Sequence, residues 1–398
     1  MTPGPGVRRT PLPKGFLASG VNCGVRRYRP DIGILISDRP AVAAGVFTLN
    51  EAKAAPVRYT QALLPSANVR AILTNSGQAN AATGAEGVEK NLMMVSAAAR
   101  ELGCQTHQVL VASTGKIGEQ LDTEKILPAM GEVVARANDC AESFATAILT
   151  TDLVPKTVTA SVNLSGGVVR ITGIAKGSGM IHPNMATMLG YILTDASLTT
   201  SHAQELIKKV SGVSFNMISV DGDSSTNDCC FLMANGASGV ALTNEKDVQK
   251  FEAVVEDIAI FLAKSIAADG EGASKLIEVQ LKGASDQALA QKAARGVTLS
   301  PLIKTAIHGE DPNWGRILAR LGAERVPAEQ LDRMSLKLQG VLLFDKGQPV
   351  PFSKDEVKGL LKAAVVKIEI NLHSGKQAAT AWGCDLSRKY VDINTEYS

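Results

Sequence analysis

Helical and extended hydrophobic patterns alternate along the whole chain, which restricts it to a fold that combines α-helices with β-sheets. The longest helix is predicted from about Lys246 to Ala268, because apolar residues recur there at the helical spacing. Asn244 stands where it would cap this helix, and Gly270 stands where it would end it. Two shorter helices are predicted, one from about Glu86 to Leu102 with Gly103 as its stop, and one that starts after Thr200 or Ser201.

The extended segments include an antiparallel pair. Thr157 to Asn163 alternates in polarity, Ser165 to Gly167 has turn composition, and Val168 to Ile174 returns, which predicts a β-hairpin. Further β structure is predicted at Leu336–Phe344 and at Val365–Leu372. Because hairpins join antiparallel strands, the sequence favours an α/β fold of the mixed α+β, layered kind over a purely parallel sheet.

Length and charge narrow the class of protein. The 398 residues suffice for two or three domains, or for one large intertwined unit. Lys and Arg number 41 against 39 Asp and Glu, without a long run of one sign, so we expect small-molecule partners and neither nucleic acid nor a membrane. No apolar stretch reaches the roughly 18 residues that span a bilayer, and Met1 to Gly15 lack the apolar core of a secretory signal. The six cysteines are scattered, which is typical of a reduced, cytoplasmic chain.

The most unusual stretch runs from Lys176 to Gly190, where small and turn-forming residues lead into Ala186, Thr187 and an apolar segment. A Gly-rich loop that enters a strand or helix, with Thr187 as its cap, explains the stretch in ordinary structural terms. The alternative is a self-cleavage site, at which the Thr187 hydroxyl attacks the carbonyl of Ala186 and hydrolysis then frees Thr187 as a new N-terminus. A nucleotide-binding loop is excluded, because neither of the two glycine-rich phosphate patterns is complete here.

A free amine at Thr187 would remedy the weakness of a threonine hydroxyl as a nucleophile. An α-amine titrates at about 7.7 to 8.0, so it can accept the hydroxyl proton within the same residue. Acyl transfer also needs hydrogen-bond donors for the developing oxyanion. Val109 to Gly118 could supply the Thr114 hydroxyl and the Gly115 amide, although by itself this segment favours an ordinary strand-to-loop turn.

Two charged residues, Lys176 and Glu271, are each either solvated surface side chains or substrate-binding residues. Lys176 is either a solvated lysine or a cation that holds a substrate carboxylate. Glu271 follows the long predicted helix and is either solvated or meets a substrate ammonium.

Patterns for metal ligands are incomplete. Asp221 to Asp228 lacks the glycine and the glutamate that a calcium loop needs at its sixth and twelfth positions. His182, His308 and His373 have neither ligand spacing nor cysteine companions. The sequence therefore predicts no metal site.

Ten motifs, in order along nearly the whole chain, resemble those of the ArgJ family, the glutamate N-acetyltransferase (ornithine acetyltransferase) enzymes of arginine biosynthesis. They are Pro13–Phe16, Ala44–Phe47, Asn75–Asn80, Ser113–Gly115, Lys176–Leu189, Asp221–Asp228, Asp269–Gly272, Ser300–Thr305, Asp311–Arg316 and Trp382–Asp385. Ten ordered motifs are far more specific than any one of them. The resemblance therefore favours the functional interpretation of Thr187.

The resemblance implies a fold and a maturation step. The fold would be a layered αββα-type sandwich of the DmpA/ArgJ-like kind, in an enzyme with an N-terminal nucleophile. Self-cleavage between Ala186 and Thr187 would give an α chain of residues 1–186, which carries the oxyanion hole, and a β chain of residues 187–398, which begins with the nucleophile. The chains would stay associated, as an α2β2 heterotetramer.

The resemblance also implies a ping-pong reaction. Thr187 would take acetyl from N2-acetyl-L-ornithine as an acyl-enzyme, and L-glutamate would then accept it, with acetyl-CoA as a second donor in a bifunctional enzyme. Exchange of one amide for another is nearly thermoneutral, so no cofactor is required. Thr114 and Gly115 match the oxyanion-hole pair of the family. The positions that match its substrate contacts are Lys176, Thr187, Glu271 and Asn394.

Three positions depart from the family pattern, and two other functions stay open. Leu153 replaces a threonine that contacts substrate, Ser398 ends the chain one residue short of the usual final contact, and Gln78 stands where the family often has Asn. One alternative is an aminopeptidase or amidohydrolase of the same self-cleaving chemistry, in which water takes the acyl group. The other is a non-catalytic amino-acid-binding relative.

Overall fold

The computed structural model describes residues 9–182 and 188–396, which form two compact units. Unit 1 comprises Met1–Gly177, Asn184–Gly212 and Ser224–Leu262, and unit 2 comprises Ser178–Pro183, Val213–Asp223 and Ala263–Ser398. Each unit thus contains residues from both sides of the predicted cleavage position. The predicted division at 186/187 concerns the chains after cleavage, not these units, and it stays a prediction.

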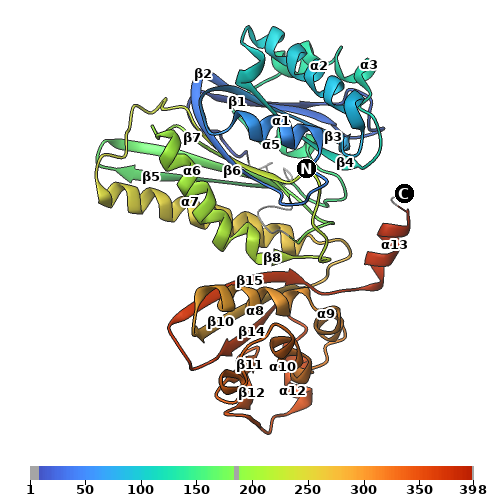
Figure 1. The fold of residues 1–398 in the computed structure, drawn as a ribbon, viewed down its shortest axis with the longest axis vertical. Helices are drawn as coiled ribbons and strands as arrows, with labels where there is room; N and C mark the ends of the chain where they lie inside the picture. The colour runs from blue at the N-terminus through green and yellow to red at the C-terminus, as the bar shows by residue number, and fades with distance from the viewer. Residues whose placement is uncertain (1–8, 183–187, 397–398) are drawn as a thin grey trace, which may run out of the picture. The chain divides into compact units, whose positions relative to one another are not determined.

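Unit 1 is built on one eight-stranded mixed sheet (Figure 1). Its strands are β1 (Phe16–Val21), β2 (Ile32–Phe47), β3 (Ser66–Gln78), β4 (Val109–Lys116), β5 (Lys156–Leu164), β6 (Gly167–Lys176), β7 (Leu189–Thr194) and β9 (Cys229–Ala234). Its helices are α1 (Ala55–Leu63), α2 (Gly84–Leu102), α3 (Thr123–Ile126), α4 (Met130–Ala135), α5 (Glu142–Ala147), α6 (Thr200–Val213) and the greater part of α7 (Glu245–Ala268), with a 3-10 turn at Thr106–Gln108. The strand order is β4-β3-β2-β9-β7-β6-β5, with β1 paired to β2.

The sheet folds back on itself at the long strand β2. The pairing of β2 with β3 shifts in register between Ile36 and Ala41, where exposed residues interrupt the strand. As a result β3 and β7, which are not neighbours in the sheet, face one another across a shared core. The hydroxyls of Thr74 on β3 and Tyr191 on β7 lie 2.8 Å apart. Tyr191 is fully buried, with Phe144 and Phe231 at ring distances of 5.0 and 5.6 Å.

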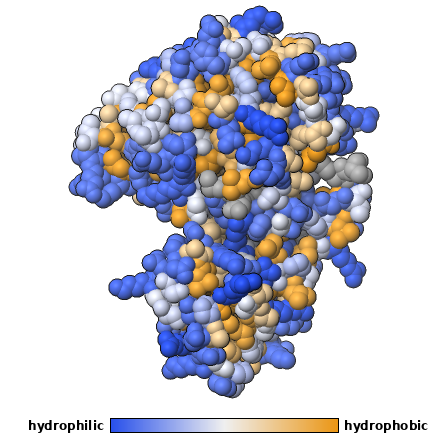
Figure 2. Space-filling view, in the orientation of Figure 1, coloured by the Kyte–Doolittle hydropathy of each residue, from blue (hydrophilic) through white to orange (hydrophobic). Residues whose placement is uncertain are grey.

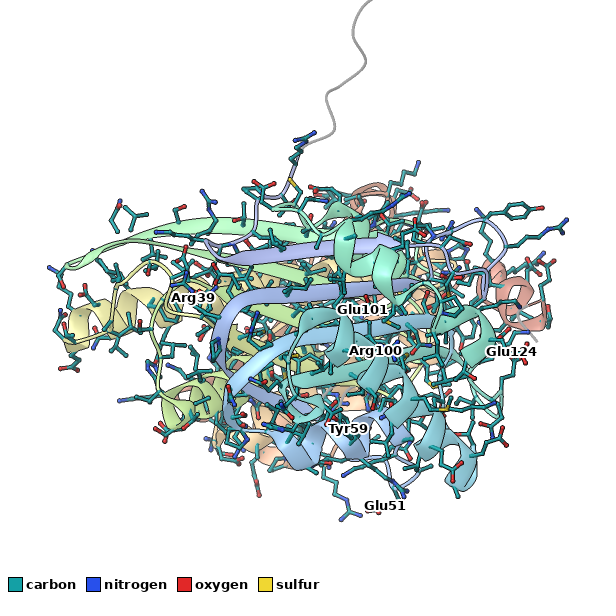
Figure 3. All side chains as sticks on the ribbon, turned by 90° about the horizontal axis from the view of Figure 1, so that it is seen from above. Arg39, Glu51, Tyr59, Arg100, Glu101 and Glu124 are labelled. Carbon is teal, nitrogen blue, oxygen red and sulfur yellow. The ribbon has the colours of Figure 1, made fainter. Side chains whose placement is uncertain are left out.

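Helices cover the outer faces of the two β layers. Along β3 and β4 the side chains alternate, so Ile72 and Leu110 join the inner core, while Leu73 and Val111 pack in an outer core with residues of α2, α3 and α4. Figure 3 shows α1 and α2 lying over these strands, with Arg100 and Glu101 near the end of α2. On β6, a Cβ atom at Gly173 would lie 2.6 Å from Ile258 of α7. The order of layers in unit 1 is therefore α, β, β, α, and the predicted mixed α/β sandwich is confirmed.

Unit 2 contains a seven-stranded mixed sheet in the order β13-β12-β11-β14-β10-β15-β8. Its strands are β8 (Ile218–Ser219), β10 (Leu276–Ala284), β11 (Ser335–Leu338), β12 (Val341–Asp345), β13 (Gln348–Pro349), β14 (Val365–Asn371) and β15 (Gln377–Cys384). Its helices are α8 (Gln287–Leu299), α9 (Pro301–His308), α10 (Trp314–Ala323), α11 (Ala328–Leu331), α12 (Lys354–Leu360) and α13 (Arg388–Glu396), with a 3-10 turn at Phe215–Met217. Helix α8 packs closely on β15, because a Cβ atom at Gly383 would lie 3.0 Å from Thr298.

Most predicted elements are confirmed. Helix α7 begins one residue earlier than predicted, and the Asn244 side chain caps it by accepting from the amide of Asp247 at 2.9 Å. Gly103 ends α2 with a positive φ of 62°, which glycine adopts at little cost. The predicted hairpin is β5–β6, paired from Lys156 with Ala175 to Leu164 with Gly167.

Two predictions of local structure need correction, at the start of α6 and at Ser113–Gly115. The helix α6 begins at Thr200, and its cap is Thr199, whose hydroxyl accepts from the amide of His202 at 3.2 Å. The β structure predicted at Leu336–Phe344 is confirmed, and it takes the form of the β11–β12 hairpin. Ser113–Gly115, predicted as a turn, continues strand β4, because parallel pairing with Asn75–Gly77 of β3 extends the ladder through it.

No helix within residues 9–182 and 188–396 has both the length and the apolar character to cross a bilayer. On the face drawn in Figure 2, hydrophilic and hydrophobic residues are interspersed within each unit.

Candidate active site

The predicted oxyanion-hole residues lie near the end of strand β4 in unit 1. Thr114 pairs with Ser76 of β3, and Gly115 pairs with Gly77. Gly115 has a φ of +136°, and a Cβ atom there would lie 2.2 Å from the carbonyl carbon of Gly77. Two backbones approach so closely at this point that only glycine fits. The position of the Thr114 side chain is thereby set by a strand pairing that tolerates little adjustment.

Lys176, the last residue of β6, points its ammonium at the same place. Its Nζ donates to the Thr114 hydroxyl at 3.3 Å and to the Thr150 hydroxyl at 2.8 Å. Lys176 is 7% exposed, so it is not a solvated surface lysine. A lysine that is this buried needs hydrogen-bond acceptors and a counter-charge to compensate for its loss of hydration.

The counter-charge is Asp152, which the sequence did not single out as a site residue. Its Oδ1 accepts from Lys156 Nζ at 2.8 Å, and its Oδ2 lies 3.8 Å from Lys176 Nζ. Burial raises the pKa of the Asp152 carboxyl, but the ammonium groups of Lys176 and Lys156 outweigh burial and hold that pKa below its usual value. Asp152 is therefore ionised at neutral pH, between two lysines.

A network of amide side chains fixes the segment that surrounds Thr114. Asn227 donates from Nδ2 to the carbonyl oxygen of Ser113 at 2.9 Å, and the Ser113 hydroxyl donates to Asn75 Oδ1 at 2.6 Å. Next to it, Asp228 is buried, and its Oδ2 has no hydrogen-bond partner among the residues that the structure describes. Burial raises the pKa of Asp228 well above its usual value, which favours the neutral carboxylic acid.

In unit 2, two further predicted residues contact one another. Asn394 of α13 donates from Nδ2 to Glu271 Oε2 at 2.8 Å. Glu271 is 9% exposed, and a Cβ atom at Gly179 would lie only 2.3 Å from its Oε1. The glycine at 179 therefore makes room for the carboxylate of Glu271. Glu271 is not a solvated surface side chain.

The segment Ser178–His182 is tied to unit 2 by its backbone. The amides of Met180 and Ile181 donate to the carboxylate of Asp221 at 2.6 and 2.9 Å. The first carboxylate of the apparent calcium loop thus serves to hold this chain segment. His182 lies 3.1 Å from the Ser219 hydroxyl, and burial, together with the charges of Arg295 and Arg320, lowers the pKa of His182 to about 4.

The structure thus brings together Thr114, Gly115 and Lys176 in unit 1, and Glu271 and Asn394 in unit 2. Ala186 and Thr187 lie outside the described residues, as does Ser398. In the described part of the chain, no three His, Cys, Asp or Glu side chains are grouped so that they could hold a metal ion. The predicted absence of a metal and of any cofactor stays a prediction.

Sequence reasoning missed Asp152 and Lys156. Both lie close to Leu153, the residue of this segment that departs from the family pattern and that is 79% exposed. The available signal was the spacing of an Asp and a Lys four residues apart before a strand that carries few other charges. That signal is weak, because such pairs are usually solvated.

Comparisons with known proteins agree with the fold and the motifs. The model of the ArgJ family matches residues 17–398. The chain is 45% identical to the arginine biosynthesis bifunctional protein ArgJ of Oceanobacillus iheyensis, over 97% of this chain and 95% of that protein. This chain belongs to the ArgJ family. It is also 44% identical to the ArgJ protein of Thermotoga neapolitana, over 97% of this chain and 99% of that one.

A solved structure supports the same assignment. The crystal structure of the ArgJ protein of Bacillus halodurans superimposes with a TM-score of 0.51 at 40% identity. That alignment covers 53% of this chain and 100% of the other. The family model and the curated relatives, which match residues 17–398 and 97% of the chain, confirm the resemblance inferred from ten short motifs along nearly the entire sequence.

Proposed function

We propose that this chain transfers an acetyl group from N2-acetyl-L-ornithine to L-glutamate through an acetyl ester on Thr187. The chain is an acyltransferase of arginine biosynthesis, as a member of the ArgJ family. The observation in the structure that carries the mechanism is the convergence of Lys176 on Thr114 at the end of β4. It provides a hydroxyl donor and a cation in one buried place.

The first half-reaction follows from the residue types. The Thr187 hydroxyl attacks the acetyl carbonyl of the donor, and its proton passes to the α-amine of the same residue. The carbonyl oxygen becomes an oxyanion, to which Thr114 and Gly115 donate from hydroxyl and amide. Collapse breaks the C–N bond, the proton returns to the leaving nitrogen, and ornithine departs. Thr187 is left as an ester.

The second half-reaction reverses these steps with another amine. The α-amine of glutamate attacks the ester carbonyl, and the proton it loses returns to the Thr187 oxygen as N-acetylglutamate forms. Donor and acceptor share an α-amino-acid head, so one set of contacts can hold each in turn. Lys176 would bind the shared α-carboxylate, and Glu271, supported by Asn394, would bind the side-chain ammonium of ornithine.

Maturation and assembly complete the proposal. Self-cleavage after Ala186 would produce the α and β chains, and two of each would form a cytoplasmic α2β2 heterotetramer. Acetyl-CoA would act as an alternative donor in the bifunctional form of the reaction. Size-exclusion chromatography without denaturant would test the assembly, since both chains should elute together.

The decisive experiment is mass spectrometry of the purified protein. We expect two chains that meet at Ala186 and Thr187, and a β chain one acetyl group heavier after incubation with N2-acetylornithine alone. Addition of glutamate should discharge that adduct. Thr187→Ala should abolish both cleavage and acetylation, whereas Thr187→Ser should retain part of each. An active, uncleaved wild-type chain would contradict the proposal.

The same incubation separates the two alternatives. If the rate of ornithine release does not depend on the glutamate concentration, water is the acceptor and the protein is a hydrolase. If N2-acetylornithine binds in a calorimeter but no acetyl appears on the β chain, the protein is a binding relative.

A further inference from the structure

Asp152 is the carboxylate around which the cationic part of unit 1 is arranged. Its side chain has no exposed surface and lies between the ammonium groups of Lys156 and Lys176. Oδ1 also accepts from the amide of Gly177 at 2.7 Å, and Oδ2 accepts from the amide of Thr150 at 3.1 Å. Gly177 follows Lys176 in the chain, and Thr150 carries the hydroxyl to which Lys176 Nζ donates. One carboxylate therefore fixes both ends of the lysine.

Two buried lysines share the ionised carboxylate of Asp152. The charge of Lys176 also acts on Asp228, but burial raises the pKa of Asp228, which favours its neutral form. A buried ammonium is stabilised where an anion lies beside it. Of the two lysines, Lys176 is the more accessible to a substrate anion, because its side chain is 9% exposed and that of Lys156 is 1% exposed.

We propose that Asp152 is a positioning residue of the acetyltransferase, which holds the Lys176 ammonium in the orientation that binds the α-carboxylate of the substrate. The inference rests on the proposed function, in which Lys176 receives that carboxylate. Asp152 acts through Lys176 and does not touch the substrate. It follows that removal of Asp152 lowers kcat/KM for substrates with an α-carboxylate. For substrates without one, kcat/KM should stay unchanged.

A pair of donors makes this testable. N-acetylputrescine has the same acetamide and the same terminal ammonium as N2-acetylornithine, but it lacks the α-carboxylate. The variant is Asp152→Asn combined with Lys156→Met, because the single Asp152→Asn change would remove the buried carboxylate that the two lysines share, whereas the double change removes one charge of each sign. The double variant keeps the same net buried charge as the wild type. Its thermal unfolding midpoint shows whether it folds normally.

The expected result is a loss that depends on the donor. Loss of a well-placed, charge-assisted hydrogen bond corresponds to a decrease of about tenfold to hundredfold in kcat/KM for N2-acetylornithine. The decrease should lie mainly in KM, and kcat/KM for N-acetylputrescine should stay within about threefold of wild type, which is under 1 kcal/mol. Asp195→Asn is the matched control, since Asp195 is also a buried acid of unit 1 that accepts from backbone amides, those of Lys14 and Arg170. Asp195→Asn should change kcat/KM for neither N2-acetylornithine nor N-acetylputrescine.

Two outcomes would overturn the inference. An equal loss for both donors would show that Asp152 serves only the structure, and an unchanged kcat/KM for N2-acetylornithine would show that Lys176 does not depend on it. The proposed function is judged separately, by acetylation of the wild-type β chain. If that adduct forms and the double variant behaves as wild type, the positioning role fails while the proposed function stands.

Discussion

Replacement of Thr114 by valine tests the proposed oxyanion hole directly. Lys176 Nζ donates to the Thr114 oxygen at 3.3 Å, so the hydroxyl accepts in that bond and its own proton is not required for it. The proton can therefore be directed at the oxyanion of the tetrahedral intermediate. Thr114→Val keeps the shape of the side chain, which suits its place in strand β4, and removes only the hydroxyl.

The size of the effect follows from comparable sites. Removal of one donor from an oxyanion hole lowers kcat by about 10² to 10³, or about 2.7 to 4 kcal/mol of transition-state stabilisation. We expect this decrease in kcat for ornithine release at saturating N2-acetylornithine and glutamate, normalised to the fraction of cleaved protein. KM should change much less, because the ground-state carbonyl gains little from the donor.

Two variants complete that experiment. Thr114→Ser keeps the hydroxyl and should retain most of the activity. Thr172→Val is the control, because the Thr172 hydroxyl is also buried in unit 1 and donates to the carbonyl of Pro11 at 2.8 Å, but it has no contact with Lys176 among the described residues. A fully cleaved Thr114→Val protein with kcat within about threefold of wild type would refute the assignment of this hydroxyl.

Three further predictions concern the supporting structure. Asp228 retains in the native state a proton that the unfolded chain releases above about pH 3.9, so its contribution to stability falls as pH rises through the native pKa, by at most about 1.4 kcal/mol per unit. Asp228→Asn should therefore flatten the dependence of the urea midpoint on pH between 5 and 8, and parallel curves would contradict this. Tyr191→Phe should cost about 1 to 3 kcal/mol, because it leaves the buried Thr74 hydroxyl without its partner, and adding Thr74→Val should recover part of that loss in a double-mutant cycle. Gly115→Ala should lower kcat at least as much as Thr114→Val, since the added carbon would meet the backbone of Gly77, and a normal kcat would show that this end of β4 can shift.

Local patterns predicted local structure well. The α7 helix, its Asn244 cap and the Gly103 stop of α2 depend on residues within a few positions of one another, and each is confirmed. The error at Ser113–Gly115 has a non-local cause. Turn-forming residues continue a strand there because β3, which begins over forty residues earlier, supplies a parallel partner. The amino-acid sequence of Ser113–Gly115 alone does not reveal that β3 will pair with it.

The candidate site was predictable only in part, for the same reason. Thr114 and Lys176 are separated by 62 residues, and Glu271 and Asn394 by 123, so spacing could not show that either pair meets. The family resemblance supplied these residues, and the structure supplied their contacts. Lys156 shows the limit of both approaches. It was assigned to no role, and in an alternating strand such a lysine is expected to be solvated, but tertiary packing buries it against a carboxylate.

The topology is compatible with the proposed cleavage between Ala186 and Thr187, because the sheet joins segments from both sides of that position. Strands β7 and β9 lie on the C-terminal side of the predicted cleavage position, and in the sheet of unit 1 they stand between β2 and β6, which lie on its N-terminal side. In unit 2, Met180 and Ile181 donate to Asp221 from the opposite side of that position. None of these bonds involves the peptide bond at 186/187. Separation of the two chains would expose the inner core and the paired edges of four strands, β2, β9, β7 and β6, so the fold does not depend on the one peptide bond. Cleavage can therefore free an amine for catalysis without loosening the scaffold that must hold it.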